Sequence, residues 1–393
     1  MGDPDYSNRN ATEKRIRRHV IGRLRDYYVI VPPGFEACCQ QELTGLGIAE
    51  SDIRVEGGGV TFAGRFVDCQ RANLHLRTAT RILMRIDSFV ATNPRILIKQ
   101  SAAVPWELYL PGGTLPRIHV SSRKSRLYHT EAVSQGIVEG IGRRWGTLPP
   151  SNPEQTLFVR LADDRVTLSL DSSGAPLYKR GIKQGPARAP LRETLAAAIL
   201  MTAGYDGSRP LVDPMCGSGS LALEAAMLAK QIAPGMRRTF AFTGWPAFGE
   251  RQWAFLKEEA GAKERVLEQP RIFASDVDQT ACRTLAAMVV ENGLSDAVAV
   301  TPGDFFDCEA GQFGKASGLV TINPPYGIRI GSKERADDLF QRTCRHLKRA
   351  FDGWTVALIA PHRNLLRQVP FAVRQIPLMH GGLRLTLLVG TIR

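Results

Sequence analysis

The sequence contains no long hydrophobic segment. No run of about 18 apolar residues is present that could cross a membrane, and the first residues lack the pattern of a secretory signal peptide. Both observations argue against an integral membrane protein or an exported one. We therefore expect a cytoplasmic protein.

Cysteine is scarce and scattered. The seven cysteines form no C-x-x-C pair and have no histidine cluster beside them. The adjacent residues Cys38 and Cys39 could bridge each other only with strain. An odd, scattered set of cysteines is typical of reduced thiols, and it predicts neither a zinc site nor another metal site.

Acidic residues are too few to balance the basic ones. The chain has 51 Lys and Arg against 38 Asp and Glu, a formal net charge of +13. This excess favours a polyanionic partner, although a basic charge alone does not prove that a protein binds nucleic acid. Residues 1–25 are especially basic and predict a disordered tail that contacts phosphates; the alternative is a solvated tail without a role.

A diproline corner late in the chain is the most informative stretch. Residues 318–321 form a short apolar run, which predicts a buried strand, and Asn-Pro-Pro-Tyr follows directly as residues 323–326. Consecutive prolines cannot continue a strand in a sheet. We therefore expect Asn323 at the carboxyl end of a strand, with its side chain presented by a stiff backbone.

This corner suits the methylation of an exocyclic amine on a flat base. Such an amine is a poor nucleophile, because its lone pair is delocalised into the ring. The side-chain oxygen of Asn323 and the carbonyl of Pro324 could accept its two hydrogens, while Tyr326 stacks on the base. Positioning and electrostatics would then carry the catalysis. The alternative is a tight turn with a surface tyrosine.

A glycine loop precedes the corner. Residues 210–220 predict a strand, a loop with Gly217 and Gly219, and the start of a helix. A further predicted strand, residues 272–276, ends in Asp276, another precedes Asp304, and residues 233–269 resemble an insertion. Residues 157–161 and 166–170 alternate with a period of two and predict a hairpin around Asp163 and Asp164. Alternating strands and helices predict a parallel sheet with helices on both faces and ligands beyond the carboxyl ends of the strands. Asp276 and Asp304 could instead cap a helix or a turn.

Together these motifs resemble the class I S-adenosylmethionine-dependent methyltransferases. Within that class, the chain resembles the THUMP-domain RNA guanine-N2 methyltransferases, and most of all their 23S ribosomal RNA subfamily. Residues 177–181, 189–197 and 242–246 match as well, and residues 371–373 and 384–389 resemble the antiparallel closing strand pair of this class. Ser220 stands where the family more often has Thr, which keeps the hydroxyl.

The resemblance implies a cofactor, S-adenosyl-L-methionine, and roles for its site residues. Asp276 would bind the ribose, Asp304 the adenine side, and Asp213 the methionine amino group. The catalytic residues would be Asn323, Pro324, Pro325 and Tyr326. The complete set expected to line the cofactor is Asp213, Met215, Cys216, Gly217, Ser218, Gly219, Asp276, Asp304, Asn323 and Thr194.

The fold class that follows is α/β. A Rossmann-like class I methyltransferase domain with a mostly parallel seven-stranded sheet would follow α+β ferredoxin-like and THUMP domains. The expected boundaries are a basic tail at 1–25, the ferredoxin-like part at 26–70, the THUMP RNA-binding domain at 71–171, a linker at 172–189 and the methyltransferase domain at 190–393. The RNA-binding side chains expected are Arg123, Lys124, Arg126, Lys179, Arg180 and Lys183.

The function that we expect is transfer of a methyl group to guanine N2 in ribosomal RNA. A transfer RNA guanine-N2 enzyme and an adenine-N6 methyltransferase acting on DNA or RNA remain alternatives. A non-enzymatic RNA-binding or assembly protein is disfavoured by the intact motifs. A nicotinamide oxidoreductase is disfavoured because Asp276 lies much farther along than the ~20 residues expected in a dinucleotide unit. Many relatives in this subfamily carry a second methyltransferase domain at the C-terminus; the sequence up to Arg393 shows no second set of these motifs, so we expect any second activity to lie elsewhere.

Overall fold

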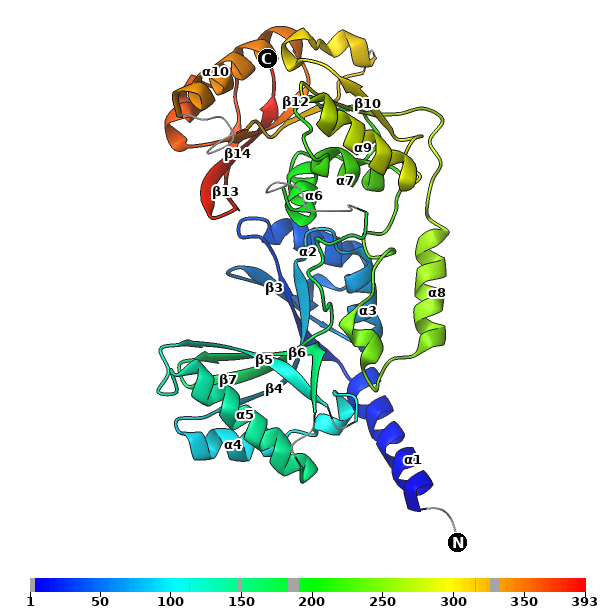
Figure 1. Cartoon of the computed structure of the whole chain (residues 1–393), viewed down its shortest axis with the longest axis vertical. Coiled ribbons are helices and arrows are strands. Elements are labelled where there is room, and N and C mark those ends of the chain that lie inside the picture. The colour runs from blue at the N-terminus through cyan, green and yellow to red at the C-terminus, as the bar shows by residue number, and fades with distance from the viewer. Residues whose placement is uncertain (1–3, 113, 148–149, 183–190, 315, 326–332) are drawn as a thin grey trace. The chain divides into compact units, whose positions relative to one another are not determined.

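The computed structural model describes residues 4–112, 114–147, 150–182, 191–314, 316–325 and 333–393 (Figure 1). Two compact units are present. The first unit comprises Met1–Val31, Cys39–Leu177 and Arg238–Lys257, and the second comprises Pro32–Cys38, Tyr178–Arg237 and Glu258–Arg393. No helix in the described ranges is long and apolar enough to span a membrane.

A single seven-stranded sheet organises the first unit. Its order is β2-β3-β1-β4-β7-β6-β5, and every neighbouring pair is antiparallel except β5 with β6. The central strand β4 pairs with β1 on one side and with β7 on the other. The strands are β1 Arg25–Ile30, β2 Ile53–Glu56, β3 Gly59–Gly64, β4 Arg81–Val90, β5 Leu115–Arg123, β6 Ser151–Ala162 and β7 Arg165–Asp171.

The ferredoxin-like and THUMP regions therefore share one sheet. Strand β4 hydrogen-bonds to β1 of the first region and to β7 of the second, with a register shift between Arg85 and Asp87. The expected boundary at 70/71 falls within a helix, α3. The helices of this part are α2 Glu36–Gly45, η2 Glu50–Asp52, α3 Phe66–His75, α4 Pro94–Ala103, η3 Trp106–Leu108 and α5 Thr130–Trp145.

Glycines allow helices α4 and α5 to approach each other closely. A Cβ atom on Gly140 would lie 2.4 Å from the Cβ of Ser101, and one on Gly136 would lie 3.0 Å from a methyl carbon of Leu97. Because Gly136 and Gly140 have no side chains, the backbone of α5 can pack directly on α4. A larger residue at either position would have no room.

The hairpin predicted around Asp163 and Asp164 is confirmed. Strands β6 and β7 pair antiparallel up to Ala162 opposite Arg165. Both aspartates have positive φ, 50° and 62°. Two successive residues of this kind give the turn whose twist matches that of paired strands, and Asp tolerates the conformation better than most residues.

The prediction of a disordered tail at 1–25 is wrong for its described part. Helix α1 (Pro4–Ile16) continues into the short π-helix η1 (Arg17–Ile21), and β1 begins at Arg25. Ile16 and Val20 are both buried, and Arg15 pairs with Glu107 at 3.0 Å. Ile16 and Val20 are four residues apart, so they share one helix face, a pattern hidden among the surrounding charges.

The second unit contains the expected methyltransferase sheet. Its order is β10-β9-β8-β11-β12-β14-β13; the first five strands are parallel, and β14 pairs antiparallel with β12 and β13. The fold-class prediction is confirmed. The strands are β8 Leu211–Asp213, β9 Ile272–Asp276, β10 Val298–Pro302, β11 Leu319–Ile322, β12 Thr355–Ala360, β13 Arg374–His380 and β14 Leu383–Thr391.

The edge strand β13 was misplaced by sequence. The closing pair is antiparallel as predicted, but its first strand runs over Arg374–His380 instead of residues 371–373. The apolar residues of this strand, Ile376, Leu378 and Met379, are interrupted by Pro377 and flanked by charged and polar residues, so they do not form the uninterrupted apolar run that marks interior strands. A proline is tolerated there because β13 lies at the edge of the sheet.

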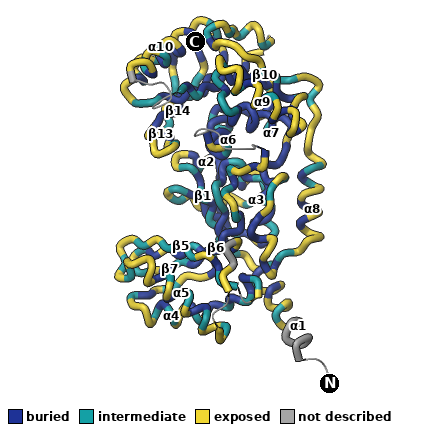
Figure 2. The backbone as a smooth tube through the Cα atoms, in the orientation of Figure 1, coloured by how far each residue is buried: buried dark blue, intermediate teal, exposed yellow. Residues whose placement is uncertain are grey.

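Burial in the second unit is concentrated on its strands and on helices α6 (Glu193–Thr202) and α7. Helix α7 (Ser220–Ala229) is buried over nearly its whole length (Figure 2). Gly318 lets β11 start close to its neighbours, because a Cβ there would lie 2.4 Å from the Pro210 carbonyl oxygen. The remaining helices are α9 Gln279–Glu291, α10 Lys333–Ala350, η5 Phe305–Asp307, η6 Ala310–Phe313 and η8 Arg363–Gln368.

The predicted insertion at 233–269 is largely built into the first unit. Residues 238–257 belong to that unit, with η4 (Ala241–Gly244) and the start of α8 (Glu250–Gly261). Trp245 stacks on Phe66 with ring centroids 5.7 Å apart, and its indole N–H donates to buried Gln155 at 2.8 Å. The Gln155 amide in turn donates to the Ala241 carbonyl at 3.0 Å. The insertion thus completes the core of the first unit.

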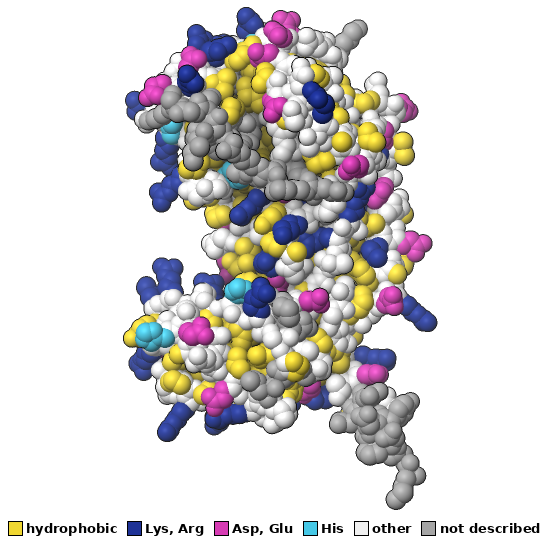
Figure 3. All heavy atoms as spheres, viewed as in Figure 1, with side chains coloured by type: hydrophobic (Ala, Val, Ile, Leu, Met, Phe, Trp, Pro, Cys, Tyr) yellow, Lys and Arg dark blue, Asp and Glu magenta, His cyan; other side chains and the backbone are white. Residues whose placement is uncertain are grey.

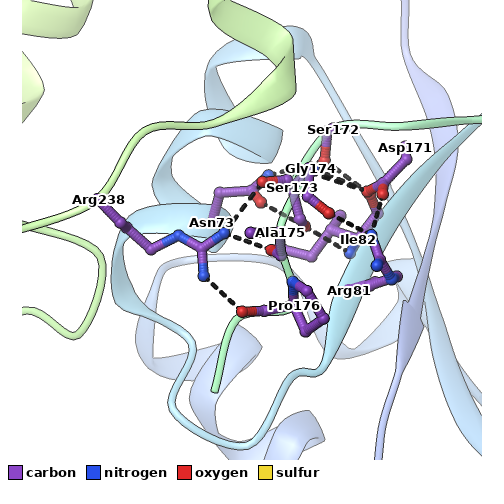
Figure 4. Close-up of polar contacts among 10 residues, drawn as sticks. All are labelled: Asn73, Arg81, Ile82, Asp171, Ser172, Ser173, Gly174, Ala175, Pro176 and Arg238. Carbon is purple, nitrogen blue, oxygen red and sulfur yellow. Dashed lines mark hydrogen bonds and ion pairs between the residues drawn. The ribbon is translucent and has the colours of Figure 1, made fainter. Parts of the chain in front are cut away.

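Arg238 fixes the start of the expected linker. Its guanidinium donates to the carbonyls of Ser173 at 3.0 Å and Pro176 at 2.8 Å, and also to that of Ala175 (Figure 4). Asn73 holds the same segment from the other side through the hydroxyls of Ser172 and Ser173. Residues 172–176 are therefore held to the first unit by hydrogen bonds.

Candidate active site

The carboxyl ends of the parallel strands bring the expected cofactor residues to one edge. In the register of the second sheet, Asp213 lies opposite Ala274 of β9, and Asp276 opposite Pro302 of β10. Strand β11 runs parallel to β8, and Asn323 follows its last residue. Residues far apart in the sequence thus meet where open α/β sheets bind their ligands.

The glycine loop has the geometry that close approach of a ligand requires. Gly217 has φ of 49°, its N–H donates to the Asp276 carboxylate at 2.9 Å, and a Cβ there would meet open space. Gly219 has φ of 73° and begins helix α7, where a Cβ would lie 2.2 Å from a methyl carbon of Leu285. Gly217 therefore leaves room beside the loop, and Gly219 lets α7 pack on α9.

Asp276 organises the loop and does not cap helix α9. One of its oxygens accepts from Gly217, and the other accepts from the Asp278 backbone N–H at 3.0 Å. Asp278 is the residue that caps α9, accepting from Thr280 and Ala281. Each carboxylate oxygen keeps a second lone pair, and Asp276 is half-buried, so it can also accept from hydroxyl groups of a ligand.

Cys216 is not a nucleophile. Burial, followed by the nearby charges of Asp213 and Asp276, raises the pKa of the Cys216 thiol well above its usual value. The thiol therefore stays protonated at neutral pH. Asp213 is itself buried, whereas Met215 and Ser218, which belong to the loop, are half-buried.

Two buried oxygens are available to a ligand. Asn323 Oδ1 and Thr194 Oγ1 are both buried, and neither has a hydrogen-bond partner among the described residues. A buried polar atom normally has a partner, so such atoms fit an incoming donor. Pro324 is buried and Pro325 half-buried, as expected for a stiff corner. Tyr326 lies outside the described residues.

Asp304 has the capping role that the sequence left open. It is exposed, and its carboxylate accepts from the Phe306 backbone N–H at 3.0 Å at the start of η5. It still lies after β10 on the same sheet edge, so contact with the adenine side of a cofactor stays a prediction.

Sequence reasoning missed a histidine at this edge. His362 follows β12, the neighbour of β11, and its Nε2 lies 2.7 Å from an Asp337 carboxylate oxygen on α10. A carboxylate only accepts, so Nε2 carries the hydrogen, and Nδ1 of a neutral ring is then an acceptor. Nδ1 is buried and has no partner in the described ranges. The sequence signal that could have identified His362 is its position shortly after a buried strand.

The prediction that Arg180 binds RNA is wrong. Arg180 is buried and pairs with Glu224 of α7 at 2.9 Å, where the exposed fractions of the two side chains are 2% and 1%. A carboxylate inside an otherwise apolar helix needs a cationic partner, and Arg180 provides it. Lys179 is exposed, and Lys183 lies outside the described residues.

Arg123, Lys124 and Arg126 are exposed around the end of β5. Lys124 has a positive φ of 49°, and Arg126 lies 3.6 Å from the Asp164 carboxylate in the neighbouring hairpin turn. Contact of this cluster with RNA stays a prediction. On the face shown in Figure 3, Lys and Arg side chains are spread over both units with Asp and Glu among them, so charge alone does not locate a binding surface.

The site can therefore hold a nucleoside-containing cofactor. It has a glycine loop, a carboxylate placed for hydroxyls, and buried acceptors. Among the described residues, no group of His, Cys, Asp and Glu side chains is placed to hold a metal ion.

Known families match the chain in three consecutive segments. The family described as "RlmL ferredoxin-like domain" matches residues 26–83, and "THUMP domain" matches residues 91–171. The family described as "RMKL-like, methyltransferase domain" matches residues 180–388, more than half of the chain. The chain belongs to the RMKL-like methyltransferase family. The resemblance seen in the sequence is confirmed.

Curated relatives of this RMKL-like methyltransferase span most of its length. It is 32% identical over 373 residues to slr0064 of Synechocystis sp., provisionally named an RNA methyltransferase, and covers 96% of that protein. It is 34% identical over 374 residues to the ribosomal RNA large subunit methyltransferase K/L of Methylococcus capsulatus. The chain spans about half the length of that second relative, 50%.

A solved structure similar to the RMKL-like methyltransferase contains a cofactor product. It is SMU.472, provisionally described as a methyltransferase and complexed with SAH; the TM-score is 0.85, the identity 28%, and 95% of this chain and 99% of that one are covered. Together with the fold and the family, this confirms S-adenosylmethionine as the methyl donor.

Proposed function

We propose that this RMKL-like methyltransferase methylates the exocyclic N2 of a guanine in RNA, and that 23S ribosomal RNA is its substrate. The observation that carries the proposal is the buried Asn323 Oδ1, which has no partner among the described residues at the carboxyl end of β11. An acceptor held there by a diproline corner suits the N–H of an aromatic amine.

Different residues of the second unit would bind different parts of the cofactor and of the target base. Residues 215–219 and Asp213 would hold the methionine part of the cofactor, Asp276 its ribose hydroxyls, and Thr194 a further polar group. S-adenosylmethionine, when bound, supplies an electrophilic methyl group. Asn323 Oδ1 and the Pro324 carbonyl would each accept one hydrogen of the target amine, turning its lone pair away from the ring. Orientation of the amine, rather than a strong base, is then the main contribution of the protein.

His362 supports guanine over adenine. Guanine carries an N1–H donor beside its N2 amine, whereas adenine N1 is an acceptor. The His362 ring is fixed by Asp337 with Nδ1 left to accept, and it follows β12, the strand that pairs with β11, after which Asn323 comes. An acceptor at this edge would pair with guanine N1–H and would oppose adenine N1.

Three features support RNA as the substrate. The THUMP match covers residues 91–171, the net charge is +13, and the K/L relative is named for ribosomal RNA of the large subunit. The target base would have to leave its stack to reach Asn323. Transfer RNA is the alternative within the same chemistry.

Mass spectrometry of RNA nucleosides tests the proposal. A strain without the gene should lose one N2-methylguanosine from its large-subunit ribosomal RNA, and the wild-type gene should restore it. An Asn323→Ala gene should not restore it. Loss of the modification from transfer RNA alone would replace the ribosomal substrate, and retention of every N2-methylguanosine would overturn the proposal.

A further inference from the structure

An open basic groove lies in the first unit, and none of its lining residues is among those assigned to catalysis. Its volume is about 860 Å³. The lining contains five arginines and a histidine but only two acidic residues. Among the residues that line it are Arg15, Arg23, Leu24, Arg25, Asp26 and Arg165.

The N-terminal segment forms one wall of this groove and is firmly held. The Arg25 guanidinium donates to the His19 carbonyl at 2.7 Å and to the Tyr109 hydroxyl, and it lies over the Tyr109 ring. Arg15 pairs with Glu107, which also pairs with Arg144 at 2.7 Å. Arg15 and Arg25 are therefore committed to holding the wall in place.

Two other arginines of the groove are uncommitted. Arg23 and Arg165 are exposed, and within the described ranges neither forms an ion pair. They come from different elements: Arg23 precedes β1, and Arg165 begins β7. Of the two acids in the groove, Asp26 is already paired with Arg54 at 2.9 Å. The other acid, Asp87, is exposed and forms no ion pair within the described ranges, so the groove offers two free arginine charges, from separate elements, against one free carboxylate.

A β-bulge in strand β4 shapes the part of the groove lined by Arg85, Ile86 and Asp87. The register with β7 shifts between Arg85 and Asp87, so Ile86 is the extra residue. Such bulges bend a strand and redirect its side chains, and they are common beside binding sites. The bulge lies where the ferredoxin-like and THUMP regions join, so the groove depends on both.

We propose that this groove binds the phosphate backbone of the RNA substrate, with Arg23 and Arg165 each contacting a phosphate. The inference rests on the proposed function in taking RNA as the substrate. A polyanion fits because the free charges come from separate elements along an open groove, and Leu24, which is 63% exposed, adds apolar surface for a sugar or base.

Salt-dependent binding of a fluorescein-labelled single-stranded RNA of mixed sequence tests the proposal in the full chain. Each lost phosphate contact should reduce the slope of log affinity against log salt by ~0.7 for a single strand. The Arg23→Gln/Arg165→Gln double variant should therefore lose ~1.4 from the slope and bind at least ~10-fold more weakly at low salt.

Arg251→Gln is the matched control. Arg251 is exposed on α8 in the first unit and is not part of the groove, so its loss removes one positive charge elsewhere, against two in the double variant, and the slopes are compared per charge removed. The control should leave the slope close to that of the wild type. Cofactor affinity by calorimetry and the melting temperature should be unchanged in both proteins.

An unchanged slope in the double variant would overturn the groove proposal, as would an equal loss in Arg251→Gln. Weaker binding of inorganic phosphate with an unaltered RNA slope would make the groove a small-anion site and would equally reject it. Failure of the proposed function is seen separately, in the nucleoside analysis of the gene-deficient strain. A reduced slope with unaltered N2-methylguanosine would keep the groove and reject that function.

Discussion

At the scale of single residues, the active site depends on acceptors held by stiff backbone. Asn323 follows β11 and precedes two prolines, one of them buried. The prolines restrict the backbone, so the position from which the Asn323 side chain extends is fixed. An amide oxygen fixed in this way needs no reorganisation when an amine arrives.

Asn323→Ala should lower turnover at least ~100-fold, the scale of losing one aimed polar group in an active site. Cofactor affinity should persist, because residues 215–219 and Asp276 remain. Single-turnover methylation and calorimetry measure the two quantities. Asn364→Ala, which removes an exposed amide from η8, is the control and should retain activity. Normal turnover in Asn323→Ala would reject its catalytic role.

Asp276→Ala should weaken binding of S-adenosylhomocysteine ~10-fold or more, because hydrogen bonds to a charged group contribute about 1.5–3 kcal/mol. The change also releases the Gly217 N–H that shapes the loop. Asp278→Ala is the neighbouring control: it removes the cap of α9 and should cost about 1 kcal/mol of stability while the affinity stays. If calorimetry finds the same affinity for S-adenosylhomocysteine in the wild type, Asp276→Ala and Asp278→Ala, Asp276 does not bind the ribose.

His362→Leu should reduce kcat/KM for RNA about 10-fold or more, because guanine N1–H would be left without a partner, at a cost of about 1–3 kcal/mol. His362→Gln should recover part of the loss, since its amide oxygen can accept. Cofactor affinity should not change in either variant. Activity in His362→Leu equal to that of the wild type would leave guanine recognition to other groups.

At the scale of elements, helix α1 is held by an ion pair, Arg15 with Glu107, that responds to acid. Burial by itself raises the pKa of Glu107, but hydrogen bonds from Arg144 and Arg15 outweigh burial and leave the pKa below its ordinary value. A folded-state pKa below the unfolded one stabilises the fold above the unfolded value, ~4.3 for Glu. That contribution is lost as the pH falls through the folded-state pKa.

Amide hydrogen exchange in α1 and η1 should therefore accelerate as the pH falls below about 4, after correction for the intrinsic rate. Glu107→Gln should show the faster exchange already at neutral pH and little further change in acid. Glu139→Gln, which removes an exposed partner of Arg143, is the control and should behave as the wild type. Protection of α1 that is independent of pH in the wild type would contradict this account.

At the scale of the whole molecule, the chain builds its two units from interleaved segments. Residues 32–38 of the second unit interrupt the first, and residues 238–257 of the first interrupt the second. Residues 238–257 are held in the first unit by the hydrogen bond of Trp245 to Gln155, that of Gln155 to Ala241, and those of Arg238 to residues 173–176.

Trp245→Ala should lower the stability of the first unit by about 3–5 kcal/mol, the usual range for removing a buried Trp. It also leaves the buried Gln155 without a donor. Trp245→Phe keeps the ring against Phe66 and should cost only about 1–3 kcal/mol. Hydrogen exchange of β6 and α3 amides measures the loss, and amides of β8 and β9 serve as the internal reference. Equal losses in both units would contradict the assignment of the insertion to the first.

Local patterns allowed correct prediction of much of this fold. The strand predicted at 272–276 is observed at Ile272–Asp276, and the turn at Asp163 and Asp164 lies where it was expected. Those features depend on short apolar runs and on the backbone preferences of a few residues. Strand β13 and helix α1 were mispredicted because their signals are weak or masked by charge, and packing with distant residues stabilises them.

The sequence by itself determined the chemistry that the chain carries: the Gly217–Gly219 loop, the Asn-Pro-Pro corner and the parallel order of their strands. These follow from dihedral preferences and hydrophobic periodicity, which are local properties. Only the tertiary structure decided which charges are free. Arg180 is neutralised by Glu224, 44 residues away, whereas Arg23 and Arg165 come together on one groove from opposite ends of the first sheet's sequence. Pairing and burial depend on residues distant in the chain, so no local pattern encodes them.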